Sequence, residues 1–497
     1  MTPMRRMGLL LVLVLACGDD DGAPDAGEDA TTDAQDSGAD ATDAGADAGP
    51  ELMTLRYVPE GCDYEVHTPE TESAERNGDV MGSEPPRHVH LGWAGSTATT
   101  INVVWETEVD TTAGRVLFGL DADAVGTADA AGGEVREASG HTFVYRAART
   151  SLMPTDRVRL HETHLCGLEP ETTYHYKVGH PGQWSEVYAF STGPSLGSTA
   201  PFRFATLGDS RNNAMNDWPV AQRALMEAGV DFQVFNGDAV FLGVLQPEWD
   251  DWFEASVDDF VVTDHLAQMP FMVSNGNHEN LAVNLIAQFA MPQDLSPGEV
   301  VAEEWYSFDY GNAHFVVLND SVEVDSVIEN EEAAWLRADL EAVDRDVTPW
   351  VFVTHHKATY TCMSNHSPNQ TTRAAWQPIF DEMEVDIVMF GHNHVYERTR
   401  PIRGLDAGEA ILAPATGDGL PTFAEPGTGS GAPSGTVYVL SGAVGAPLYD
   451  VSDTCPTSLV AAATSNYVVV DVADRTITVT AYETQSGAEL DRFTYTK

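Results

Sequence analysis

Positive charge is scarce in this sequence. Lysine and arginine together number 25 against 77 aspartate and glutamate residues, which gives a net charge of −52, and lysine occurs only at Lys177, Lys357 and Lys497. Without residues 1–50 the chain still carries 23 basic and 66 acidic residues, a net charge of −43. Nucleic acids are held by clustered lysine and arginine, so the composition excludes a nucleic-acid partner.

Long apolar runs are also missing, with one exception at the start of the chain. In residues 1–17, MTPMRRMGLLLVLVLAC, two arginines precede an apolar run that ends at a small residue and Cys17. This pattern is typical of a secretory signal, and its apolar core is too short to span a bilayer. The ending Val-Leu-Ala-Cys resembles the lipobox of bacterial lipoproteins, which implies lipidation at Cys17 rather than plain cleavage. We therefore expect an exported protein that faces the periplasm or the cell exterior and contacts a membrane only through this anchor.

Cysteine is sparse as well. After Cys17 the mature chain keeps four cysteines: Cys62, Cys166, Cys362 and Cys455. An even number in an exported protein permits two disulfides, and four cysteines allow three pairings. Pairing within each expected domain gives Cys62 with Cys166 and Cys362 with Cys455.

What remains divides into three parts. Residues 18–50 are almost all Asp, Ala, Gly, Thr and Pro, which predicts a solvated acidic linker. Residues 84–193 hold short alternating strands and turns that fit an all-β sandwich. From 200 to 497, apolar runs alternate with helical patterns, which predicts an α/β fold: a layered β-sandwich flanked by helices, with carboxyl-terminal hairpins that extend its sheet.

Polar residues follow five of the apolar runs in this α/β part. The runs end at Asp209, at Asp238, at Asn277 and His278, at His355 and His356, and at His392 and His394. Any one of these is usually a cap or a turn residue, but so many polar groups at one sheet edge need a compensating partner such as a metal cluster. Oxygen and nitrogen donors without a thiolate suit Fe, Mn or Zn with open positions. Two metals bridged by a carboxylate clamp a phosphate and activate water, which predicts phosphoester hydrolysis.

The order of these motifs resembles a known family. GDS, NGD, GNHE, V-x-x-H and GHNH resemble the five blocks of the calcineurin-like metallophosphoesterases. GHNHVYERT, together with THLCGLEPETTYHYKVG and WSEVYAFSTGP, further resembles the purple acid phosphatases. The resemblance covers roughly residues 84–497 and implies a fibronectin type III-like domain at 84–193 before a metallophosphoesterase domain at 200–497.

The resemblance also implies a ligand set for two divalent or mixed-valence metal ions. Asp209, Asp238 and His394 would hold the first ion, and Asp238 would bridge to the second. The second ion would also take Asn277, His355 and His392. We prefer His355 over its neighbour His356 because it closes the strand.

Three further residues are candidates for substrate contact. By resemblance, His278 would face the phosphate and protonate the leaving oxygen. Arg211 would hold a phosphate oxygen as a fork donor. His366 is a possible substrate contact, with a plain surface histidine as the alternative.

One position departs from the family pattern. Purple acid phosphatases have Gly-Asp-x-x-Tyr, in which the tyrosinate ligates ferric iron, whereas Phe241 stands here. Position 211 also lacks the histidine that other branches of the superfamily use at the first metal. The first site is therefore one protein ligand short, and we expect Mn or Zn there rather than Fe(III), with water or substrate filling the gap.

These observations together predict an exported dinuclear-metal phosphatase that hydrolyses small phosphomonoesters by attack of a metal-bound hydroxide. A phosphodiesterase or nucleotide hydrolase of the same superfamily is an alternative, because selectivity lies in loops such as 240–262 and 361–371. A non-catalytic surface-anchored binding or adhesion protein is another. The sequence does not indicate the oligomeric state.

Overall fold

The computed structural model describes the residues in the ranges 52–53, 55–68, 71–72, 78–148, 156–211, 216–279, 282–293, 304–322, 324–363, 365–404, 422–423, 435–451 and 457–497. The expected signal, Cys17, the acidic linker and Cys455 lie outside these residues. Among the described residues, no helix is both long enough and apolar enough to cross a membrane.

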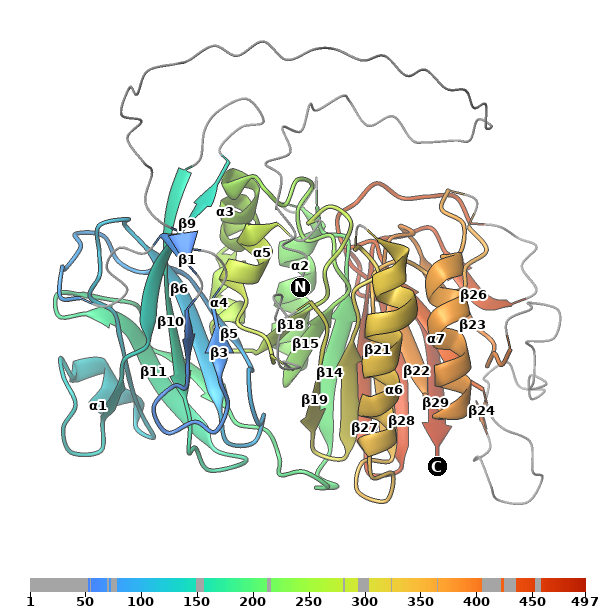
Figure 1. Ribbon diagram of the computed structural model, residues 1–497, viewed down its shortest axis with the longest axis horizontal. Helices are drawn as coiled ribbons and strands as arrows, with labels where there is room; N and C mark the ends of the chain where they lie inside the picture. The colour runs from blue at the N-terminus through green and yellow to red at the C-terminus, as the bar shows by residue number, and fades with distance from the viewer. Residues whose placement is uncertain are drawn as a thin grey trace, which may run out of the picture.

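The amino-terminal domain is a sandwich of two antiparallel sheets, as the sequence predicts (Figure 1). Its inward positions are apolar: Ile101, Val103 and Trp105 alternate along one strand and are fully buried. One sheet runs in the order β5 (Arg87–Gly92), β6 (Ile101–Thr107), β10 (Asp156–Leu165) and β9 (His141–Ala147). The other runs in the order β12 (Gln183–Trp184), β11 (Thr173–His180), β7 (Arg115–Gly119) and β8 (Arg136–Ala138), and β13 (Tyr188–Ser191) also pairs with β11.

Short elements and a disulfide complete this domain. They are the helix α1 (Ala122–Thr127) and the two-stranded pairs β1 (Leu52–Met53) with β4 (Thr71–Glu72) and β2 (Arg56–Tyr57) with β3 (Val66–His67). The disulfide between Cys62 and Cys166 confirms the first expected pairing. Cys362 is also disulfide-bonded. Its pairing with Cys455 stays a prediction, because Cys455 is not among the described residues.

The α/β domain is built on two seven-stranded sheets. The first sheet runs in the order β18 (Phe271–Val273), β15 (Phe232–Phe235), β14 (Phe202–Leu207), β27 (Asn466–Ala473), β28 (Thr476–Glu483), β29 (Glu489–Thr496) and β24 (Thr422–Phe423). The second sheet runs in the order β19 (Tyr306–Tyr310), β20 (Ala313–Val317), β21 (Trp350–Thr354), β22 (Ile387–Phe390), β25 (Val437–Ser441), β23 (Tyr396–Thr399) and β26 (Ser458–Ala462). Strands β14, β15 and β18 are parallel, as are β20, β21, β22 and β25, so their carboxyl ends gather at one edge of each sheet.

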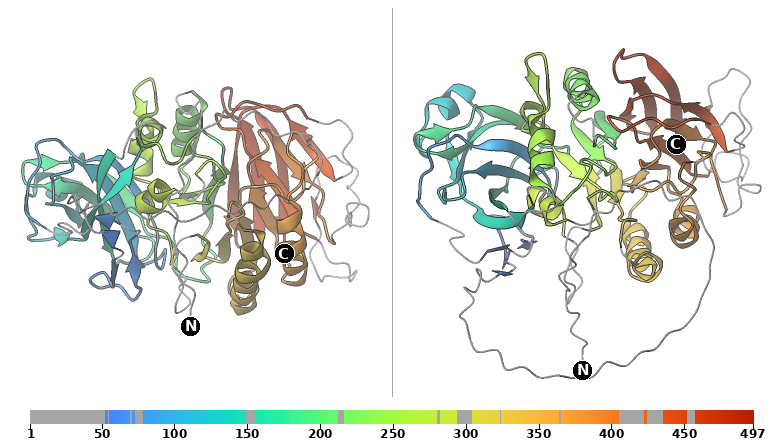
Figure 2. Two further views of the ribbon diagram at one scale, coloured as in Figure 1. Left: turned by 45° about the horizontal axis from the view of Figure 1, so that its top comes forward. Right: turned by 90° about the horizontal axis from the view of Figure 1, so that it is seen from above.

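The two sheets face each other and helices cover their outer faces, which confirms the predicted layers. Between the sheets, the ring of Phe204 packs edge-on against Phe315 and Phe352 at 5.0 Å from each. On the outer faces, Trp218 packs against the first sheet from α2 (Asp217–Ala228), and Trp376 packs against the second sheet from α7 (Gln370–Glu382), beside α6 (Ala333–Ala342). Figure 2 shows the gold and orange helices α6 and α7 side by side outside one sheet. The π-helix η1 (Val327–Glu332) leads into α6.

The remaining elements join the two domains. They are α3 (Gln246–Glu254), the hairpin β16 (Ser256–Val257) and β17 (Phe260–Val261), α4 (Val262–Leu266) and α5 (Val283–Gln288). The hydroxyl of Tyr145 in the sandwich donates to the side chain of Gln246 at 2.6 Å, and that of Tyr176 donates to the carbonyl of Ala267 at 2.6 Å. The two domains therefore share a buried, hydrogen-bonded boundary.

Candidate metal centre

Side chains from both sheets of the α/β domain meet at the seam where their parallel strands end. The first sheet provides oxygen donors and the second provides imidazoles. The contributors are Asp209, Asp238 and Asn277, after β14, β15 and β18, and His356, His392 and His394, after β21 and β22.

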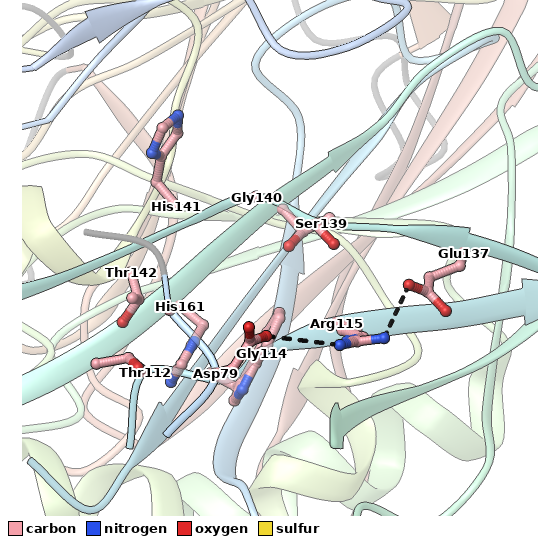
Figure 3. A pocket seen from close by; sticks show the side chains of 13 residues that line it. Asp79, Thr112, Gly114, Arg115, Glu137, Ser139, Gly140, His141, Thr142 and His161 are labelled. Carbon is pink, nitrogen blue, oxygen red and sulfur yellow. Dashed lines mark hydrogen bonds and ion pairs between the residues drawn. The ribbon is translucent and has the colours of Figure 1, made fainter. Parts of the chain in front are cut away.

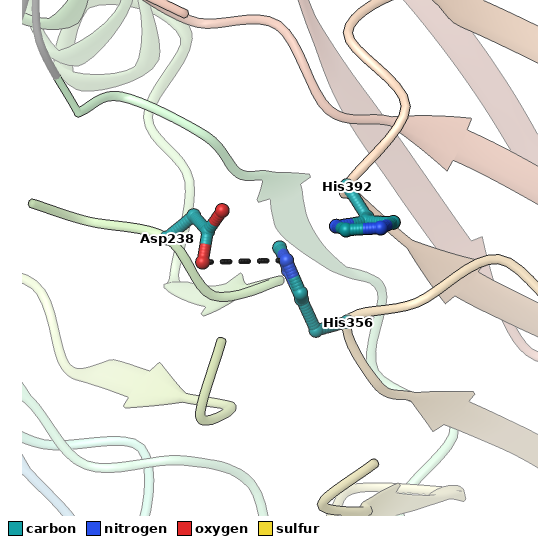
Figure 4. Close-up of side chains that lie close together, drawn as sticks. All are labelled: Asp238, His356 and His392. Atoms are coloured by element: carbon teal, nitrogen blue, oxygen red, sulfur yellow. Dashed lines mark ion pairs between the residues drawn. The ribbon is translucent and has the colours of Figure 1, made fainter. Parts of the chain in front are cut away.

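Three of these residues present ligand atoms that all lie within 4.8 Å of one another: Asp238, His356 and His392 (Figure 4). The Nε2 atom of His356 is 3.3 Å from Oδ1 of Asp238 and 3.0 Å from Oδ1 of Asn277. Its Nδ1–H donates to the carbonyl of Asn236 at 2.8 Å. Metal-binding histidines are typically held in this way, with one nitrogen fixed by a protein carbonyl and the other facing the metal.

Asp209 and His394 form the other half of the cluster, together with Arg211. Nε2 of His394 is 3.4 Å from Oδ1 of Asp209, and its Nδ1–H donates to the carbonyl of Pro447 at 2.6 Å. The guanidinium of Arg211 reaches into the cluster: its Nη2 is 2.5 Å from Nε2 of His394, and its Nη1 contacts Nε2 of His278. Arg211, predicted as a phosphate contact, therefore lies among the predicted ligands.

The carboxylate oxygens of the two aspartates fit a cation. Asp209 and Asp238 are both 0% exposed, and Oδ1 of Asp209 and Oδ2 of Asp238 accept no hydrogen bond among the described residues. A buried polar atom without a partner costs about 1–3 kcal/mol, and a charged one costs more. Carboxylate, amide and imidazole donors suit Fe, Mn or Zn. The residues present therefore fit a metal ion.

The backbone at these strand ends is in a costly conformation. Asp209, Asp238 and His392 have φ angles of 57°, 57° and 70°, in the left-handed region that disfavours side chains with a Cβ. Such residues persist where the surroundings hold them and cluster at functional sites. Gly391 allows the close approach between the sheets, because a Cβ there would lie 2.3 Å from Oδ2 of Asp209. The N–H of His392 donates to that same oxygen at 2.9 Å.

The structure corrects one predicted position: His356 joins the cluster, and His355 points away from it. Nδ1 of His355 lies 2.8 Å from Oδ2 of Asp320, and its ring packs edge-on against Trp376 of α7. Successive residues in extended chain point to opposite faces, so only one of the two neighbours can face the first sheet. The V-x-x-H spacing counted from Val353 ends on His356, and this signal identifies the histidine that faces the cluster.

The candidate substrate residues lie around the cluster. The Nδ1–H of His278 donates to the carbonyl of Phe241 at 2.6 Å, and the two rings lie 5.1 Å apart. The ring of His366 lies 4.1 Å from that of His392, and its Nε2 is 3.1 Å from the hydroxyl of Tyr449. His366 is therefore next to the cluster, and Tyr449 is a neighbour that the sequence analysis missed.

Glu279, the last residue of the GNHE block, has a structural role that the sequence alone did not indicate. Its carboxylate is buried and accepts from the backbone N–H groups of Asp238, Gly276 and Val240, at 2.8, 3.0 and 3.2 Å. Burial and the nearby carboxylate of Asp238 raise the pKa of Glu279 to about 7. Glu279 therefore holds the loop that carries Asp238, and its place in the quoted block was the available signal.

A buried ion pair connects the two sheets behind the cluster. Arg398 of β23 pairs with Asp491 of β29, with Nη2 at 2.9 Å from Oδ1, and Tyr396 donates to Oδ2 of the same carboxylate at 2.8 Å. Arg398 is 2% exposed. The Tyr-Glu-Arg part of GHNHVYERT therefore contributes to the joint between the sheets, a role that the sequence alone did not indicate.

Charges within the cluster shift its pKa values. Burial lowers the pKa of His356, but the carboxylate of Asp238 outweighs that effect and raises it to about 10. Burial and the charge of His356 lower the pKa of His392 well below its ordinary value. A proton on His356 and a metal ion both satisfy Asp238, so metal binding here displaces protons.

A separate hollow of about 680 Å³ lies in the sandwich domain (Figure 3). Arg115 at this hollow pairs with Glu137 at 3.2 Å and with Asp79 at 3.8 Å. None of the clustered strand-end residues lines it. The hollow is therefore distinct from the candidate metal centre.

Each of the two domains matches the model of a known protein family. The model of the purple acid phosphatase N-terminal domain matches residues 86–192, and that of the calcineurin-like phosphoesterases matches residues 202–396.

Two relatives illustrate the extent of the similarity. An uncharacterized protein of Mycobacterium tuberculosis strain H37Rv is 28% identical over 359 residues, which cover 65% of this chain and 64% of that protein. Purple acid phosphatase 22 of Arabidopsis thaliana is 30% identical over 256 residues, which cover 49% of this chain and 54% of the plant protein. The matched region thus spans less than two thirds of either relative.

Among solved structures, the chain is similar to the purple acid phosphatase PPD1 from yellow lupin (Lupinus luteus) seeds. The TM-score is 0.68 at 19% identity, and the match covers 83% of this chain and 74% of the lupin chain. At this identity the match shows a shared fold. The chain therefore combines a domain that matches the purple acid phosphatase N-terminal domain with one that matches the calcineurin-like phosphoesterases, and it shares the fold of the lupin protein.

Proposed function

We propose that the chain is an exported, metal-dependent phosphatase that hydrolyses phosphomonoesters. The observation that carries the proposal is the pair of buried carboxylates, Asp209 and Asp238, each with an oxygen that accepts no hydrogen bond among the described residues. Oδ1 of Asp209 lies 3.4 Å from Nε2 of His394, and Oδ2 of Asp238 lies 3.8 Å from Nε of Arg211 and from Nε2 of His278. A metal cation would satisfy these oxygens, and the matching family acts on phosphoesters.

Metal ions would be held by the oxygen donors of the first sheet and the imidazoles of the second, and Fe, Mn and Zn all suit this set. The donors are Asp209, Asp238, Asn277, His356, His392 and His394. A bound divalent ion supplies Lewis-acid activation of the phosphate and of water. Phe241 cannot act as a tyrosinate ligand, so we expect a colourless or weakly coloured protein.

The chain's own side chains would bind the substrate and move its proton. The Nδ1–H of His278 is held by the carbonyl of Phe241, which leaves Nε2 facing the cluster. In the imidazolium form, Nε2–H can give its proton to the departing alcohol oxygen. Arg211 presents donors to the same space and would bind a phosphate oxygen. His366, beside His392, would contact the substrate where it enters.

Export is supported by the signal pattern before Cys17 and by a disulfide. Cys62 and Cys166 are bonded, and disulfides persist in oxidising compartments outside the cytoplasm. We propose that Cys17 carries the lipid anchor. Labelling of the expressed protein with a radioactive fatty acid tests this, and a Cys17→Ser variant that takes up as much label as the parent contradicts it.

Activity assays on the mature protein, purified in detergent, test the proposed reaction. We expect a chromogenic phosphomonoester to be hydrolysed faster than the matching diester, only when Mn, Zn or Fe is bound. Faster diester hydrolysis would move the assignment to a phosphodiesterase or nucleotide hydrolase. A protein that binds no metal and turns over neither substrate would instead be a surface-anchored binding protein.

A further inference from the structure

The two halves of the metal centre differ in what lies between their ligands. On the side of His356 and His392, the two imidazoles and Asp238 present ligand atoms that all lie within 4.8 Å of one another. On the other side, the guanidinium of Arg211 lies against His394 and His278, with its Nε 3.8 Å from Oδ2 of Asp238. Arg211 is 9% exposed, so its charge is taken up by the cluster rather than by water.

Arg211 uses the lone pair that a metal ion would need. The Nδ1–H of His394 donates to the carbonyl of Pro447, so the lone pair of this imidazole is on Nε2. Nη2 of Arg211 is 2.5 Å from that Nε2 and donates to it. A metal ion would have to stand about 2.0–2.1 Å from the same atom. The guanidinium and a metal ion therefore exclude each other at this position.

The protein ligands on this side are also fewer. The predicted ligands on this side are Asp209, His394 and the shared Asp238. Phe241 cannot act as a ligand, and position 211 is an arginine rather than a histidine. The other side has four donors, Asp238, Asn277, His356 and His392. A complete set therefore exists for one ion.

We propose that Arg211 takes the place of one of the two metal ions. The chain then binds a single divalent ion through Asp238, Asn277, His356 and His392. The guanidinium supplies the second positive charge, next to His394 and Asp238, where it faces the phosphate. This inference rests on the proposed function and specifies how many ions it uses.

Metal stoichiometry tests the inference without reference to turnover. The mature wild-type protein, equilibrated with excess Mn²⁺ and passed through a desalting column, should retain one Mn per chain by mass spectrometry. Arg211→His, which removes the charge and adds a ligand, should retain two. Arg211→Lys, which keeps a positive charge, should retain one, as should Arg223→Ala, a control at an exposed arginine paired with Asp258.

Electron paramagnetic resonance of the Mn-loaded wild-type protein gives a second measurement that needs no variant. One isolated ion gives a six-line spectrum, whereas two ions about 3.5–4 Å apart are exchange-coupled. Two tightly held, coupled ions in the wild type would overturn the inference and leave the proposed function standing. A wild-type protein that holds no metal would contradict the proposed function itself, and the inference with it.

Discussion

The two sheets of the α/β domain contribute different chemistry to the same seam. The first sheet ends in acids and an amide, and the second ends in imidazoles. The acids leave oxygens unpartnered, whereas the imidazoles arrive with one nitrogen already fixed by a carbonyl, as His356 is by Asn236 and His394 by Pro447. The metal centre therefore draws on both sheets and forms where the carboxyl ends of their parallel strands meet.

The largest effect should come from removing the acid that lies between the two halves of the metal centre. Asp238→Asn should lower metal content below about one tenth of the wild-type value and kcat/KM by more than about a hundredfold, because its carboxylate lies near His356 on one side and Arg211 on the other. Mass spectrometry of the metal and the monoester assay check this together. Asp471→Asn, at an exposed aspartate in the first sheet, is the control and should change neither. Retained metal with full activity would remove Asp238 from the site.

Within the second sheet, the neighbouring histidines should separate metal binding from stability. His356→Ala should weaken metal binding about 10- to 100-fold. His355→Ala should keep the metal but lower the free energy of unfolding by roughly 1–3 kcal/mol, because the buried carboxylate of Asp320 loses a partner. Metal titration and denaturant unfolding give the two readouts. If His355→Ala lost the metal while His356→Ala kept it, the structural placement of these side chains would be wrong.

Substitution of a glycine at the contact between the sheets tests whether metal binding depends on their close approach. Gly391→Ala places a Cβ against Oδ2 of Asp209, so either the acid or the His392 strand end must shift. We expect metal binding to be about tenfold weaker. The free energy of unfolding should change less than the free energy of metal binding. Gly126→Ala in α1, where a Cβ makes only ordinary contact, is the matched control. Unchanged affinity in Gly391→Ala would show that the approach of the sheets is not limiting.

A histidine of the second sheet outside the seam should affect stability alone. Burial lowers the pKa of His314, but hydrogen bonds to Asp309 and Asp339, at 2.8 and 2.9 Å, outweigh this and raise it to about 9. The pKa of His314 in the folded protein lies above the value of about 6.5 in the unfolded chain. The charged imidazole therefore contributes fully to the free energy of unfolding below pH 6.5, and this contribution disappears as the pH rises to about 9.

Denaturant unfolding of the metal-free protein between pH 6 and 9.5 checks the His314 prediction. Over this pH range, the free energy of unfolding should fall by roughly 1–2 kcal/mol more in the wild type than in His314→Gln. Metal content should not differ between the two proteins. Equal pH dependence would show that His314 is not charged in the folded state.

The sequence predicted the strand ends well because buried parallel strands leave a clear pattern, an apolar run stopped by glycine and a polar residue. Asp209, Asp238, Asn277, His392 and His394 were all placed in this way, and the structure brings them together. The choice between His355 and His356 failed because the run before them is apolar on both faces. Phe352 and Thr354 face the first sheet while Val353 faces α7, and that orientation follows from packing rather than from composition.

Other residues were missed because their partners lie far away in the chain. Arg398 finds Asp491, and His366 finds Tyr449, only after the sheets are assembled. The position of Arg211 was predicted as a phosphate contact from its distance to Asp209 in sequence. Its contact with His394, which changes the expected number of metal ions, depends on a loop geometry that spacing does not encode.

The pairing of β14 with β27 has a consequence for how the protein is made. Thr206, three residues before Asp209, pairs with Val468, which the ribosome adds long after both aspartates, the GNHE block and every histidine of the cluster. Until then β14 has an open edge, which invites pairing with other chains, and pairings so distant in sequence form slowly. The arrival of β27 therefore sets the earliest moment at which the metal-binding edge can close.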